Sequence, residues 1–219
     1  MTQGLLDFDP ALVRGCAMWI EADGPNTLNG TTISEFYDRS GSGNHASQGT
    51  AIRQAEKTLD CANGEPCATF DGTDDYYAAP SIQLPGDFTL MAVAKMLSKA
   101  RRIISKDNVG NRDYALRVDT ATGAPEVAFF NGANLYVAEA TTNITAGTPV
   151  RHVITGMHAG TDLKIFLDGT LENTVSDLPT TVNTTTIPTE IGRIGTGAEY
   201  LHGFLTAAMI FKLALQPLE

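Results

Sequence analysis

The feature that most constrains this chain is the short length of its apolar segments. Within each segment the apolar residues alternate with polar ones or form a short run, without a helical repeat. Turns rich in Gly, Asn and Asp separate the segments. Such segments are typical of strands, and the longest are expected at residues 88–96 and 204–213. About a dozen of them, with no long amphipathic helix, predict an all-β fold. The expected architecture is a two-sheet antiparallel jelly-roll β-sandwich, and the alternative is a β-barrel.

Two segments depart from this pattern. Residues 9–13 (DPALV) can form one helical turn, with the Asp as the cap and the Pro at the first position. The Thr-rich residues 179–189 are either an edge strand or a loop. The length of 219 residues suits one domain over residues 1–219. Within it, residues 1–14 form an N-terminal arm and residues 15–219 form the sandwich.

The acidic balance of the chain restricts its partners. A net charge of −10 repels phosphate backbones, so nucleic acid is not an expected partner. No apolar run approaches a membrane span, so membrane insertion is not expected either. The amino end lacks a basic region followed by an apolar stretch, so it is not a signal peptide. We expect a chain that is made and kept in a cytoplasm, one that leaves by cell lysis, or one cut from a longer protein.

Three cysteines are too few for a disulfide framework. Cys16 lies in an apolar run and is expected in the core. Cys61 and Cys67 bracket the turn at residues 63–66. Free thiols are the expectation for this pair, and a bridge across the turn is the alternative.

Five segments carry a family resemblance. They are residues 17–23 (AMWIEAD), 36–46 (FYDRSGSGNHA), 66–76 (PCATFDGTDDY), 166–169 (FLDG), and 191–193 (IGR) followed by 200–204 (YLHGF). In this order they resemble the laminin-G-like group of the concanavalin A-like lectin/glucanase superfamily. The resemblance implies a jelly-roll sandwich. Because the family includes lectins, adhesion modules, glycosidases and lyases, the fold alone does not give the function.

Catalytic patterns of the family are not matched. Its glucanases place acids on one strand as E-x-D-x-(x)-E, and the nearest segment here is Glu21-Ala22-Asp23-Gly24-Pro25-Asn26. Asn26 replaces the third acid, and Gly24-Pro25 interrupts the strand. The lyase branch uses Gln-x-His, which no histidine here matches. His152 and His158 share one face of an expected strand and are interpreted as half-buried strand residues. We therefore expect no enzymatic activity.

The resemblance implies a calcium ion at the rim of the sandwich. Asp71, Asp74 and Asp75 are the candidate ligands, because they crowd one corner and offer hard oxygen atoms. Asp38 and Asn44 crowd a second corner. The alternative is that these side chains only cap turns.

Candidate contact residues fall into two groups. Four tyrosines can stack on a sugar ring if they are exposed: Tyr76, Tyr77, Tyr136 and Tyr200. A basic stretch in this acidic chain can dock an acidic partner or an acidic glycan, through Lys99, Arg101 and Arg102. The alternative for the basic stretch is a solvated face without a partner.

An adhesion-type fold without an export signal or a disulfide framework favours a bacteriophage virion protein. The expected role is a tail, fibre or head-decoration subunit in the virion, as a homo-oligomer or part of a larger assembly. Its partners would be other virion proteins or a host-surface glycan. The alternatives are a carbohydrate-binding module of a secreted or cell-surface protein, and a polysaccharide-degrading enzyme.

Overall fold

Antiparallel strands dominate the chain in the computed structural model, which describes residues 12–62, 64–99, 101–108, 110–145 and 150–215. The strands are β1 (Cys16–Glu21), β2 (Thr27–Asn29), β3 (Thr32–Phe36), β4 (Ala46–Ser47), β5 (Glu56–Ala62), β6 (Glu65–Asp71), β7 (Tyr77–Ala79), β8 (Phe88–Met96), β9 (Arg101–Asn108), β10 (Asn111–Val118), β11 (Pro125–Asn131), β12 (Asn134–Glu139), β13 (His152–Ala159), β14 (Asp162–Leu167), β15 (Thr170–Val175), β16 (Thr189–Ile191) and β17 (His202–Phe211). A short 3-10 turn, Ala51–Arg53, precedes β5.

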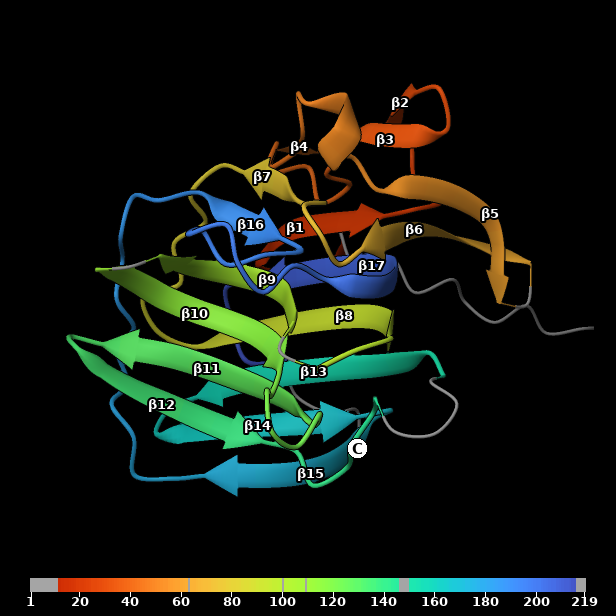
Figure 1. The fold of residues 1–219 in the computed structure, drawn as a ribbon. Coiled ribbons are helices and arrows are strands. Elements are labelled where there is room, and N and C mark those ends of the chain that lie inside the picture. The colour runs from red at the N-terminus through yellow and green to blue at the C-terminus, as the bar shows by residue number, and fades with distance from the viewer. Residues whose placement is uncertain (1–11, 63, 100, 109, 146–149, 216–219) are drawn as a thin grey trace, which may run out of the picture.

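The pairings arrange the strands in two layers. One layer runs β15-β14-β13-β8-β17, and both β1 and β6 pair with the remaining edge of β17, with β5 beyond β6. The other runs β12-β11-β10-β9-β16-β7-β4. Strand β3 pairs with both β4 and β5 and so joins the layers. Figure 1 shows β9 to β12 lying over β8 and β13 to β15. This is the predicted jelly-roll sandwich, and the barrel alternative is wrong.

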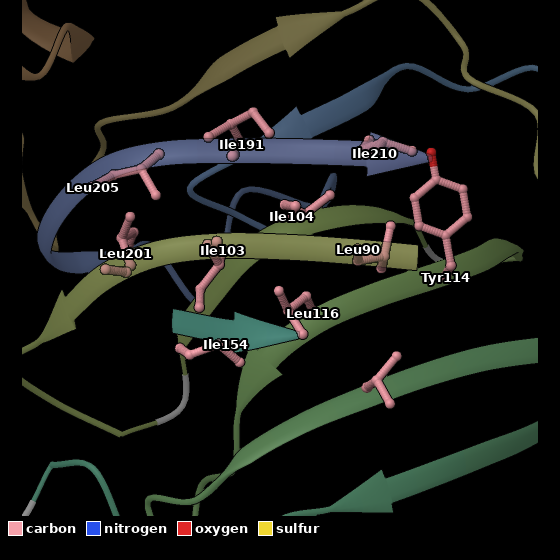
Figure 2. Packing of buried hydrophobic residues seen from close by; sticks show 14 of the residues in the cluster. Leu90, Ile103, Ile104, Tyr114, Leu116, Ile154, Ile191, Leu201, Leu205 and Ile210 are labelled. Carbon is pink, nitrogen blue, oxygen red and sulfur yellow. The ribbon is translucent and has the colours of Figure 1, made fainter. Parts of the chain in front are cut away.

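The core fills the space between the two layers. Leu90, Ile154 and Ile210 come from one layer, and Ile104 and Leu116 come from the other. All five are fully buried, and Figure 2 shows them pointing into the shared interior. Burial of alternate residues along β8 and β14 follows from the period of two in their sequences.

A smaller apolar cluster lies apart from this core. Its buried members are Trp19, Ala207, Met209 and Phe211, on the adjacent strands β1 and β17. Cys16 is half-buried and packs against this cluster, and its thiol donates a hydrogen bond to the Met18 carbonyl. The prediction that Cys16 belongs to the main core is therefore corrected.

Cys61 and Cys67 form a disulfide that links β5 to β6. Their Cα atoms are 5.9 Å apart, within the usual span of a bridge. The expectation of free thiols is wrong for this pair, because the β5–β6 hairpin holds the two side chains together.

The two irregular segments have different outcomes. Residues 179–188 form no strand and lead into β16, so the loop alternative describes most of the Thr-rich segment. The helical turn expected at residues 9–13 lies mostly outside the described residues. Among the described residues, no helix has the length and hydropathy needed to cross a bilayer.

Candidate functional site

The turn between β6 and β7 gathers three carboxylates. Asp71 ends β6, and Asp74 and Asp75 follow before β7. One oxygen of each lies within 4.8 Å of the others. Asp71 Oδ1 accepts the Thr73 N–H at 2.7 Å, and Asp75 Oδ2 accepts the Asp71 N–H at 2.9 Å. These two bonds close the turn and fix the carboxylates beside one another.

Burial and crowding perturb Asp75 most. Its side chain is almost fully buried. Burial raises the pKa of Asp75 to about 6, the Asp71 N–H bond opposes the rise, and the charges of Asp71 and Asp74 add to it. A cation would relieve this repulsion, and oxygen atoms in a turn are the ligands that calcium prefers. The residues present therefore fit a calcium ion held by Asp71, Asp74 and Asp75.

Tyr76 lies beside these acids and stacks on an arginine. The Arg193 guanidinium carbon is 3.3 Å from the centre of the Tyr76 ring. The pKa of Tyr76 is lowered, chiefly by a hydrogen bond with Gln48. Burial alone would lower the pKa of Arg193, but the bond and charge of Glu190 outweigh it, and a hydrogen bond with Tyr200 adds to the rise. Arg193 is thus held as a cation among aromatic and acidic groups.

A close approach of two loops creates this arrangement. Gly192 has φ +92°, and a Cβ there would stand 2.7 Å from the Phe70 ring and 3.3 Å from the Asp75 carbonyl oxygen. Only glycine allows this backbone and this distance. The Ser105 hydroxyl donates to the Arg193 carbonyl at 2.6 Å and fixes the next residue. The loop after β16 is therefore pressed against the β6–β7 turn.

We name this group the Asp–Tyr corner. Its members are Asp71, Asp74, Asp75, Tyr76, Arg193 and Tyr200. Arg53 borders it, with its Nε 3.7 Å from Asp74 Oδ2. Figure 1 shows β7 and β16 side by side, and the corner is formed by the turn before β7 and the loop after β16.

The corner contains some of the predicted residues and excludes others. The three acids, Tyr76 and Tyr200 are brought together. Tyr77 is fully buried, and its ring packs on Phe36 and Phe70, so the prediction that it is an exposed stacking residue is wrong. Tyr136 is half-buried on β12 and stacks on Phe129. Strands β16, β9, β10 and β11 separate it from β7.

The predicted docking residues also differ in how exposed they are. Lys99 is exposed and donates to the Ala121 carbonyl at 2.5 Å. Arg101 is half-buried, and its Nε donates to Ser98 at 2.7 Å. Arg102 is 3% exposed and pairs with Asp107 at 3.2 Å and Glu199 at 2.7 Å. Arg102 is therefore not available for docking, because its charge is buried and paired.

The segments tested for catalytic patterns have structural partners. Glu21 pairs with Arg39 and accepts a bond from the Trp19 indole. The Asn26 amide donates to the carbonyls of Glu21 and Ala22, which closes a turn. The second crowded corner is a turn as well, because Asp38 accepts backbone N–H groups of Trp19, Ser40 and Asn44.

The two strand histidines differ from each other. His152 pairs with Asp168 at 2.8 Å and is half-buried, as predicted. His158 is fully buried, between the carbonyls of Gly86 and Pro179. The expectation of half-burial is therefore corrected for His158.

Comparisons with known proteins give the family. A profile of the concanavalin A-like lectin/glucanases superfamily matches residues 71–219, more than half of the chain. A search of curated proteins finds no match.

Solved structures share the fold at low identity. The binding domain of Paraclostridial Mosquitocidal Protein 1 matches with a TM-score of 0.66 and 10% identity over 92% of this chain and 50% of that one. Domain 4 of an extracellular arabinanase from Geobacillus stearothermophilus, solved with arabinotriose, matches with a TM-score of 0.65 and 12% identity over 92% and 94%.

A mouse laminin alpha1 structure, domains LG4-5, matches with a TM-score of 0.52 and 13% identity over 64% of this chain and 40% of that one. The chain thus spans about half the length of the mosquitocidal binding domain and nearly all of the arabinanase domain. At these identities the likeness shows the fold. The profile match over most of the described sandwich shows that the chain belongs to the concanavalin A-like lectin/glucanases superfamily.

Proposed function

We propose that this chain is a non-catalytic recognition module that binds a glycan at the Asp–Tyr corner, with one calcium ion held by Asp71, Asp74 and Asp75. The observation that carries the proposal is the convergence of separate loops. Tyr76 follows β6, whereas Arg193 and Tyr200 follow β16, yet the guanidinium contacts both phenols. Tyrosine offers an apolar ring and a hydroxyl together. The ring can pack on the C–H groups of a sugar, and the hydroxyl can bond to the sugar hydroxyls.

The fold relatives support a binding role. The arabinanase domain that covers nearly the same length was solved with arabinotriose. An oligosaccharide suits the corner, because calcium, carboxylate and guanidinium groups can all bond to sugar hydroxyls.

The state of the acids supports a role without catalysis. A glycosidase needs two carboxyl groups free to act on one sugar bond. Glu21 is paired with Arg39, and Glu126 is paired with Arg117 at 2.5 Å. Asp71 and Asp75 each accept a backbone N–H of their own turn, and Asp74 lies beside Arg53.

A glycan array in millimolar calcium tests this proposal. We expect the wild-type protein to bind a defined set of glycans, and Tyr200→Ala or removal of calcium with EGTA to reduce that signal at least tenfold. Tyr37→Ala is the matched control, because Tyr37 is 46% exposed and its ring packs on His45 outside the corner. No binding by the wild type, or equal binding by Tyr200→Ala, would contradict the proposal. Turnover of β-glucans, alginates or sulfated galactans would contradict the non-catalytic part.

We propose a bacteriophage virion as the setting, with the chain as a tail, fibre or head-decoration subunit within a homo-oligomer or a larger assembly. The Cys61–Cys67 disulfide supports a working place in oxidising surroundings outside the cell. Mass spectrometry of purified particles tests this setting. Recovery of the chain in stoichiometric amounts is the expected result, and its recovery only from a secreted, particle-free fraction would contradict it.

A further inference from the structure

A hollow lies at the tips of two hairpins, on other strands than the Asp–Tyr corner. The β9–β10 turn, the β11–β12 turn and the loop before β16 enclose a cavity of about 400 Å³. Its lining includes Gly110, Arg112, Phe130, Gly132, Ala133 and Asn183. This volume is at the small end of the range for ligand sites and suits one or two sugar rings. We name it the Arg112 pocket.

Hydrogen bonds hold the walls of the pocket in place. The Asn183 amide nitrogen donates to the carbonyls of Arg112 at 2.8 Å and Gly132 at 2.9 Å. Its amide oxygen accepts the Gly132 N–H at 2.9 Å, and its backbone N–H donates to the Phe130 carbonyl at 2.8 Å. One side chain therefore ties the loop to both hairpins. A cavity fixed in this way is formed before a ligand arrives, which lowers the cost of binding.

The charges beneath the pocket cancel one another. Lys106 and Asp113 are fully buried and pair at 2.8 Å. Lys106 also donates to the Thr185 carbonyl at 2.7 Å, and Asp113 accepts the Thr185 N–H at 2.9 Å. Their ionic groups are thus satisfied within the protein and leave no net charge toward the cavity.

Arg112 is different, because its charge reaches solvent. Its side chain is 43% exposed, and its Nε lies 3.3 Å from Asp107 Oδ1. Asp107 is almost fully buried and also pairs with Arg102, so one carboxylate serves two guanidinium groups. Among the described residues, Asp107 is the one ion-pair partner of Arg112. The terminal nitrogens of Arg112 therefore present positive charge at the cavity of a protein whose net charge is −10.

The floor beside this guanidinium is aromatic. The Arg112 guanidinium carbon is 5.3 Å from the centre of the Phe130 ring. Open space lies beside Gly110 and Gly132, where a Cβ would meet no atom within 4 Å. Phe130 itself is only 4% exposed, so its ring supports the guanidinium from below. A planar fork of N–H groups matches a carboxylate.

We infer that the Arg112 pocket binds a carboxylate-bearing sugar, such as a uronic acid residue of an acidic glycan. The carboxylate pairs with the terminal nitrogens of Arg112, and the sugar ring lies in the open space beside Gly110 and Gly132. This inference stands apart from the proposed function, because it uses no residue of the Asp–Tyr corner and no calcium.

NMR titration of the full ¹⁵N-labelled chain in EGTA tests the inference. We expect glucuronate to shift the amide signals of Gly110, Gly132 and Ala133 with a Kd on the order of 1 mM. Glucose, which lacks the carboxylate, should shift none of them. Arg112→Gln should weaken glucuronate binding at least tenfold. Arg101→Gln is the matched control, because it removes an arginine on the same strand as Asp107 but outside the pocket.

Ala133→Trp provides a second variant that does not touch the charges. Ala133 is exposed at the β11–β12 turn, so a large side chain there fills the cavity without entering the core. It should abolish the shifts while the remaining spectrum stays unchanged. Equal shifts with glucose, equal shifts with inorganic phosphate, or full binding by Arg112→Gln would each overturn the inference. Because EGTA removes calcium, failure at the Asp–Tyr corner does not affect this result.

Discussion

At the scale of single residues, burial and the neighbouring charges of Asp71 and Asp74 together disfavour the ionised form of Asp75. Its folded pKa is about 6, above the value of 3.8 for a free aspartate. The folded state therefore binds more protons between these values, so Asp75 makes the free energy of unfolding fall as pH rises from about 4 to about 6. In EGTA, the loss is expected to be about 2 kcal/mol over that window. Asp75→Asn should remove it, whereas Asp23→Asn, at an exposed turn, should not.

Calcium should restore the lost free energy of unfolding only at pH values at which Asp75 is ionised. We expect calcium to raise the Tm at pH 7.5 and to have little effect at pH 5, where a proton occupies Asp75. Thermal unfolding in calcium and in EGTA at both pH values measures this. An equal rise at pH 5, or none at pH 7.5, would contradict calcium binding through Asp75.

Tyr77 shows a second residue-scale effect. Its hydroxyl accepts the Ala55 N–H at 2.8 Å and donates to the Ile33 carbonyl at 2.7 Å, and burial raises its pKa. Tyr77→Phe leaves both groups buried without this partner, so we expect a loss of about 1–3 kcal/mol in the free energy of unfolding. Urea denaturation checks this, with Tyr37→Phe as the half-exposed control. A loss in the control as large as in Tyr77→Phe would argue against a stabilising role for the two hydrogen bonds of the Tyr77 hydroxyl.

Sequence alone places Tyr76 and Tyr77 on opposite faces of a strand, but it does not say which face is buried. That choice depends on the rings of Phe36 and Phe70, which come from other strands. The same limit applies to Arg102, whose burial depends on Glu199 far along the chain.

At the scale of elements, a glycine lets two strands of the facing layers approach each other closely. A Cβ on Gly156 of β13 would stand 2.4 Å from the Val127 Cβ of β11. Gly156→Ala forces the layers apart, so we expect a loss of about 1–3 kcal/mol in the free energy of unfolding. Gly49→Ala is the control, because a Cβ there meets nothing within 4 Å. Chemical denaturation compares the two, and equal stabilities would contradict this packing.

The strands that the sequence pattern predicts are the ones with a buried face. Phe88–Met96 matches β8, because apolar residues alternate along it. The pattern misses the short strands β2 and β4. It also misses β5 and β15, since both are polar and are defined by hydrogen bonds to a neighbouring strand. It also leaves residues 179–188 open, because backbone bonds from Asn183 and Thr185 to the hairpins decide their course.

At the scale of the whole molecule, order along the chain does not indicate which loops meet. The five family segments predict the sandwich, and the Asp triad is adjacent in sequence. The contact of Tyr76 with Arg193 requires the register of β7 on β16, in which Ile191 lies opposite Tyr77. The Arg112 pocket likewise requires three separate turns, and no sequence motif marks it.

The molecule should also unfold as one unit. Strand β3 joins the layers, and one main core contains residues from both. We therefore expect a single calorimetric transition whose van't Hoff and calorimetric enthalpies agree. Two separated transitions would contradict the prediction of one domain over residues 1–219.

X-ray diffraction from crystals soaked in calcium and neutral oligosaccharides tests the central claim most directly. The predicted result is an ion bonded to Asp71, Asp74 and Asp75, with a sugar against Tyr200 and Arg193. A sugar bound elsewhere, with the Asp–Tyr corner empty of both ion and sugar, would contradict the account.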